Sequence, residues 1–101
     1  MSEQRIDTIR LQRIARGFTE TAVFYAAIDL DLFTHVSHGA ASIDAVAAAA
    51  NISALNAERT VVVLLAMGLL EKDVDGQLRN APDCEKFMVS TSEELSSWEY
   101  L

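Results

Sequence analysis

The side chains that most often carry out covalent chemistry are scarce in this sequence, which has one cysteine, Cys84, and two histidines, His35 and His38. A nucleophilic cysteine needs a general base beside it, and nothing in the spacing brings either histidine near Cys84. A single thiol cannot form an internal disulfide, which is typical of proteins from a reducing compartment. We therefore predict a chemically inert thiol that is buried or neutral at the surface.

The other candidates for chemistry are equally weak. His35 and His38 share one face if their segment is helical, but two imidazoles without a supporting cysteine or acidic cluster are a poor metal site. Glu93 and Glu94 are adjacent, so they would point in different directions on a helix. Neither a nucleophile elbow nor a glycine-rich phosphate loop is present. The sequence predicts no catalytic, cofactor-binding or metal-binding residue in this chain.

Length and charge limit the possible functions further. The 101 residues fit one domain, 1–101, and are too few for a Rossmann-type cofactor domain with its substrate-binding elements. The net charge of -7 argues against a generic nucleic-acid binder and against anionic membrane surfaces. The longest apolar stretch, Val61–Leu70, is much shorter than the roughly 20 residues of a membrane span, and the polar N-terminus does not resemble a secretory signal. We expect a cytoplasmic domain that functions as part of a larger protein or assembly.

A long proline-free segment from about Gln4 to about Asp29 is predicted to form the first helix. One apolar face recurs at helical spacing, and its predicted role is a dimer interface made by Leu11, Ile14, Phe18, Ala22 and Tyr25. A second apolar set lies on other sides of the same helix: Val23, Phe24, Ala27 and Ile28. A helix that is apolar all round must be buried all round, and a small domain has few elements to cover it. A second copy of the chain is the simplest cover, and packing within one monomer is the alternative.

Shorter helices are expected next. Leu30 to Val36 reads as a helical turn that Gly39 ends. Ser42 is a plausible N-cap for the alanine-rich segment that follows it, and Ser53 is expected to open a helix that extends to Leu70.

A β-hairpin is expected after these helices. Its predicted strands are Glu71–Val74 and Gln77–Arg79, with an Asp75–Gly76 turn between them. Pro82 is expected to stop the second strand and begin a short helix. A further helix start is expected at Ser90 or Thr91.

This order of elements, helices followed by a two-stranded wing, predicts a mainly α, winged helix-turn-helix-like domain. Such domains often bind DNA through the second helix of the pair, which needs basic or amide side chains. Here Glu58 and Arg59 cancel on that helix, and the wing is acidic at Glu71, Asp73 and Asp75. These charges argue against nucleic acid as a partner, and a free-standing acidic winged-helix regulator stays open as the alternative function.

Four segments, in order, carry a resemblance to a known family: AAIDLDLFTHV, SIDAVAAAANI, NAERTVVVLLAMGLLEK and DGQLRNAPDCEKFMV. The third is the most specific, with an arginine, spaced leucines and a Gly-Leu-Leu-Glu step into the wing. From about Leu11 to Leu101 the chain resembles the N-terminal dimerisation domain of class I S-adenosylmethionine-dependent O-methyltransferases that act on small molecules in plant and bacterial secondary metabolism.

The resemblance implies a domain without chemistry of its own. In the family this domain exchanges helices with its twin to form an intertwined homodimer, and it helps to wall the acceptor pocket of the neighbouring subunit. The S-adenosylmethionine site and the catalytic histidine lie in a C-terminal Rossmann-like domain that this chain lacks. No catalytic residue carries over. The implied partners are a second copy and a catalytic methyltransferase domain or subunit, with small aromatic or polyketide-like acceptors; a stand-alone ligand-binding or partner subunit is the other possibility.

Overall fold

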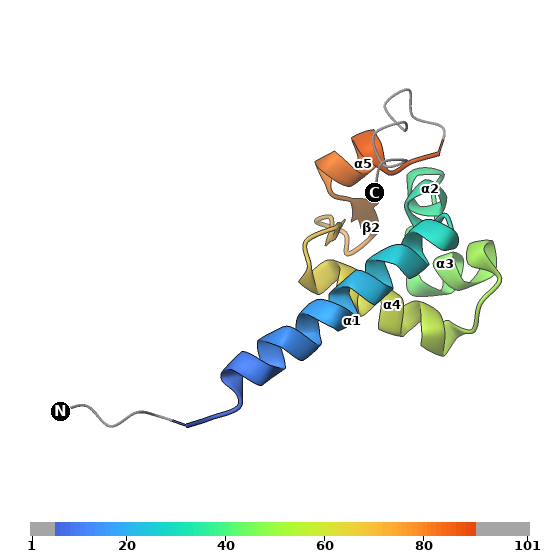
Figure 1. The fold of residues 1–101 in the computed structure, drawn as a ribbon. Helices are drawn as coiled ribbons and strands as arrows, with labels where there is room; N and C mark the ends of the chain where they lie inside the picture. Colours follow the sequence, from blue (N-terminus) through green and yellow to red (C-terminus); the bar gives the residue numbers. More distant parts are fainter. Residues whose placement is uncertain (1–5, 91–101) are drawn as a thin grey trace.

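Five helices and one β-hairpin make up residues 6–90, the part of the chain that the computed structural model describes (Figure 1). The elements are α1 (Ile9–Asp29), α2 (Leu32–Ser37), α3 (Ile43–Ala50), α4 (Ala54–Ala66), β1 (Leu70–Lys72), β2 (Leu78–Asn80) and α5 (Pro82–Phe87). This order confirms the predicted mainly helical fold with a small hairpin after the fourth helix. The predicted helix start at Ser90 or Thr91 falls at the edge of the described residues and mostly outside them.

The residues that were predicted to start or end helices do so at several positions. The hydroxyl of Ser42 accepts a hydrogen bond from the backbone N–H of Ala45 at 3.1 Å, and Ser53 caps α4 in the same way through Asn56 at 3.1 Å. Pro82 is at the start of α5, where a missing N–H costs nothing. Gly39 follows α2 with a φ of 110°, a backbone conformation that L side chains rarely adopt.

Two helix boundaries differ from the prediction. The helix α1 begins at Ile9 and not near Gln4, because the Asp7 carboxylate accepts from the Ile9 N–H at 3.1 Å and so turns the chain before the helix. The helix α4 ends at Ala66 and not at Leu70. Its end is set by Gly68, whose φ of 77° breaks the helix, while the N–H of Leu69 bonds back to the Leu64 carbonyl at 2.9 Å.

The hairpin is also shorter than predicted. Leu70 pairs with Asn80 and Lys72 with Leu78, so five residues, 73–77, form the connection in place of a two-residue turn. The Asp73 carboxylate stabilises this loop by accepting from the N–H groups of Asp75 and Gln77 at 2.9 and 3.0 Å. Val74, predicted to be in a strand, is fully exposed in the loop.

The core lies where α2, α3, α4 and β1 meet. Its largest fully buried side chains are Phe33, Leu32, Leu64, Leu70, Val46 and Val61. The helix α1 contributes Ala27, with Val23 and Phe24 packed partly against the core. It contacts α2 and α4, whereas residues 9–19 are all exposed and Figure 1 shows the N-terminal half of the helix extending away from the other elements. Among residues 6–90, no helix combines the length and apolar character needed to cross a bilayer.

Candidate dimer interface and adjoining groove

All five residues of the predicted interface are exposed on one face of α1. Phe18 retains 78% of its exposure, Ile14 61%, Leu11 59% and Tyr25 47%; Ala22 is exposed as well. The other apolar set of the helix faces the core, with Ala27 fully buried and Val23 and Phe24 half-buried. Within residues 6–90, the chain therefore covers one apolar side of α1 and leaves the other exposed.

Four large apolar side chains on one exposed face are energetically costly. Burying each would contribute about 1.5 to 3 kcal/mol, a large sum beside the modest stability expected of a chain of this size. An exposed contiguous apolar face on a small domain usually marks an interaction site. We call Leu11, Ile14, Phe18, Ala22 and Tyr25 the α1 stripe.

A groove of about 480 Å³ runs beside the α1 stripe, between α1 and the connection from α4 to β1. Its lining is mostly apolar: Gly17, Glu20, Thr21, Phe24, Tyr25, Met67 and Leu69. Nothing lies within 4 Å of the place where a Cβ atom on Gly17 would be, so this glycine leaves open space on the helix surface. In the sequence, only Gly17, an isolated glycine within a strong helical pattern, could have indicated the groove.

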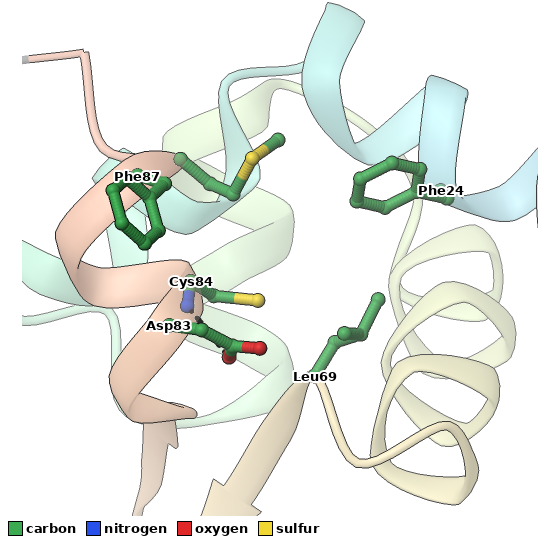
Figure 2. A pocket seen from close by; sticks show the side chains of 6 residues that line it. Phe24, Leu69, Asp83, Cys84 and Phe87 are labelled. Carbon is green, nitrogen blue, oxygen red and sulfur yellow. Dashed lines mark hydrogen bonds between the residues drawn. The ribbon is translucent and has the colours of Figure 1, made fainter. Parts of the chain in front are cut away.

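A second and smaller cavity, of about 160 Å³, adjoins the groove and shares Phe24 and Leu69 with it. Figure 2 shows Phe24 of α1 facing α5 across the space, with Leu69 below it and the Cys84 sulfur pointing between them. Asp83, Phe87 and Met88 complete the lining. Except for the Asp83 carboxylate and the thiol, the cavity has no polar side chain to orient a ligand.

Cys84 has the properties that were predicted for it. The residue is 3% exposed. Burial raises the pKa of its thiol from 9.0 to about 12, and the charge of the adjacent Asp83 adds to the shift. A neutral, buried thiol is a poor nucleophile. His35 lies within α2 and is half-buried, and His38 follows the last residue of α2 and is exposed. No group of three potential metal ligands occurs within residues 6–90.

A polar cluster that the sequence did not reveal, with Asn80 buried and Ser37 and Glu85 exposed, joins the hairpin to two helices. The Asn80 amide donates to the Phe33 carbonyl at 2.8 Å and to Glu85 Oε1 at 2.9 Å. The Ser37 hydroxyl donates to the other oxygen of Glu85 at 2.6 Å. Through these bonds β2 and α5 are held against α2. Nothing in the sequence spacing links residues 33, 37, 80 and 85, so only the tertiary structure shows the cluster.

A second set of polar bonds ties the end of the described chain to the start of α2. Asp31, with a φ of 55°, forms the sharp bend between α1 and α2. The Thr34 hydroxyl donates to Asp31 Oδ1 at 2.8 Å and accepts from the N–H of Ser90 at 2.7 Å. These bonds hold Ser90 beside the α1–α2 bend.

The face of α4 that would meet DNA in a winged helix has no net positive charge with which to bind a polyanion. Leu55 and Val62 are each 53% exposed there. Glu58 and Arg59 are exposed between them. In the wing, Glu71 neutralises Arg79 through an ion pair of 3.1 Å.

The comparison with protein families settles the class of the chain. A family model described as the O-methyltransferase dimerisation domain matches residues 12–90. The chain belongs to this family. The match includes most of the α1 stripe and every element up to α5, and it confirms the resemblance seen in the sequence. No curated protein sequence matches the chain significantly.

Solved structures of methyltransferases share the fold. Human N-acetylserotonin methyltransferase, solved in complex with S-adenosylmethionine, is 26% identical with a TM-score of 0.75 over 91% of this chain. An O-methyltransferase family 2 protein of Planctomyces limnophilus, in complex with apigenin, is 23% identical with a TM-score of 0.77 over 92% of this chain. An O-methyltransferase family protein of Burkholderia thailandensis is 22% identical with a TM-score of 0.71 over 90%. The dimerisation-domain chain covers 28%, 28% and 27% of these three proteins, less than a third of their length.

Proposed function

We propose that this chain is the self-associating part of an S-adenosylmethionine-dependent O-methyltransferase and that residues 1–101 form one domain. The observation that carries the proposal is the α1 stripe, an apolar face left exposed on a chain of the dimerisation-domain family. A second copy would cover it. In this assignment Leu11, Ile14, Phe18, Ala22 and Tyr25 are interface residues, and the intertwined homodimer is the assembled form.

The chemistry would take place elsewhere. Methyl transfer needs a cofactor site, and the chain offers neither a phosphate-type glycine loop nor an activated nucleophile. A catalytic domain or subunit in the cytoplasm would bind S-adenosylmethionine, as the human relative does. The acceptors we assign are small aromatic or polyketide-like molecules, because the groove beside the stripe is lined by the aromatic rings of Phe24 and Tyr25 and by Leu69, and a relative of the same fold binds apigenin.

Sedimentation equilibrium tests the self-association. We expect a dimer at micromolar concentration, and a stable monomer there would contradict the proposal. Isothermal titration with S-adenosylmethionine should give no heat with this chain alone, whereas saturable binding would show that the cofactor site had been assigned to the wrong part of the enzyme.

The regulator alternative rests on the order α3, α4, β1, β2, which is that of a winged helix. It requires salt-dependent binding to duplex DNA. Because the helix α4 presents Leu55 and Val62, we expect no measurable binding at physiological salt.

A further inference from the structure

The α1 stripe has a symmetry of its own. Its members follow one another at intervals of three, four, four and three residues, so the pattern reads the same in both directions about Phe18. All five side chains are exposed. In a two-fold dimer the same patch meets itself, so that residue i contacts residue j and j contacts i. A patch whose apolar positions have the same spacing in both directions along a helix fits such an axis.

We infer that two copies of α1 pair antiparallel across a two-fold axis at Phe18, an inference that rests on the proposed self-association. Phe18 then meets Phe18 of the other copy, Leu11 meets Tyr25, and Ile14 meets Ala22. The most exposed of these aromatic side chains, Phe18, lies at the centre, where interfaces usually have their strongest contacts. Ala15, three residues before Phe18, is exposed as well, and such a small residue lets two helices approach closely.

Charge supports both the second copy as the occupant and the antiparallel direction. Between residues 6 and 16 the chain has three arginines, Arg10, Arg13 and Arg16, and one acid, Asp7. From residue 17 to residue 90 it has ten acidic and four basic side chains. An antiparallel pair places the basic half of each α1 beside the acidic body of the other copy, whereas a parallel pair places the basic halves together.

The charged residues of α1 are not placed to stabilise the helix dipole, so their distribution is better explained by contact with a partner. Its first turn has no acidic residue and its last turn no basic one, although the helix dipole favours that arrangement. The three arginines lie in the half of α1 that extends away from the body, where every residue from 9 to 19 is exposed. Among the described residues, Asp7 and Glu20 are the acids nearest to them in sequence, and the acidic body of a second copy would supply more.

Opposite charges at position 18 test the axis. Phe18→Lys and Phe18→Glu each place like charges against one another at the axis, so each variant alone should dimerise at least about 30-fold more weakly than the wild type. Mixing the two should restore association as a heterodimer, because a lysine then faces a glutamate. Gln12→Lys and Gln12→Glu are the matched controls, since position 12 is turned about 100° away from Leu11 and should show neither loss nor rescue.

A second pair of variants tests the register. Leu11→Glu and Tyr25→Lys should each weaken the dimer, and the double variant should recover association as a homodimer, because position 11 of one copy faces position 25 of the other. The two positions are roughly 21 Å apart along one helix at 1.5 Å per residue, so they cannot pair within the same chain. Far-UV circular dichroism follows the fold of each variant, and rescue on mixing counts equally if the single variants are monomeric or unfolded.

The outcomes separate this inference from the proposed function. A monomeric wild type would overturn both. A wild-type dimer that tolerates Phe18→Lys and Phe18→Glu, or variants that weaken it without rescue on mixing, would overturn the axis at Phe18 and leave self-association standing. Sedimentation velocity on the mixed and separate variants measures every one of these results.

Discussion

The amide of Asn80 joins parts of the domain that are distant in sequence. It is 7% exposed and donates to the Phe33 carbonyl and to Glu85. Asn80→Ala removes both hydrogen bonds, together with the buried Asn80 Oδ1 that has no partner among the described residues, and the lost bonds should lower the free energy of unfolding by about 1 to 3 kcal/mol. Urea denaturation measures the change. Asn56→Ala, at an exposed position of α4, is the matched control and should change it little; equal losses would mean that the buried amide has no special role.

The thiol of Cys84 should make stability depend on pH. Its pKa is raised from 9.0 to about 12 in the folded chain, first by burial. Above pH 9 the unfolded chain ionises this thiol while the folded chain keeps it neutral, so its contribution is complete below pH 9 and is lost as the pH rises toward 12. The unfolding free energy should fall over that interval, and less steeply in Cys84→Ala. Parallel curves for the two proteins would contradict the assignment.

At the scale of the elements, Gly68 decides where α4 stops. Its φ is 77° and no atom would meet a Cβ there within 4 Å, so Gly68→Ala should cost only the backbone strain of a left-handed residue, about 1 to 2 kcal/mol. Gly68→Asn should cost less, because asparagine tolerates this conformation. Thermal unfolding of the two variants gives the comparison. If alanine and asparagine were equally harmless, another feature would have to end the helix.

The sequence predicted those parts of the fold that depend on neighbouring residues. The caps at Ser42 and Ser53 and the start of α5 at Pro82 could be read because each signal acts within three residues. The end of α4 could not, since the leucines after Gly68 continue the helical pattern while the strand pairing of Leu70 with Asn80 removes them from it. The α1 stripe followed from periodicity, whereas the groove and the Asn80 cluster depend on contacts between distant segments.

At the scale of the whole molecule, the separation of charge along the chain should govern association. The basic half of α1 is opposed to an acidic remainder. Salt shortens the reach of such attraction from about 10 Å at 0.1 M to about 3 Å at 1 M, so the dimer dissociation constant should rise about tenfold over that range. Replacing Arg10, Arg13 and Arg16 by glutamine should weaken the dimer at low salt and flatten the dependence. Analytical ultracentrifugation at several salt concentrations provides the measurement, and a dimer that tightens with salt would point to an interface held by apolar contacts alone.

The half of α1 that extends from the body has a consequence for how folding and assembly are linked. Residues 9–19 are all exposed in the single chain, and an isolated helix of that length is marginal in water. Its backbone amides should therefore exchange with deuterium quickly when the protein is dilute and slowly when copies are abundant, while the amides of α4 exchange slowly at both extremes. The amount of helix in this protein would then be set by its concentration, and α1 would complete its folding only upon meeting its twin.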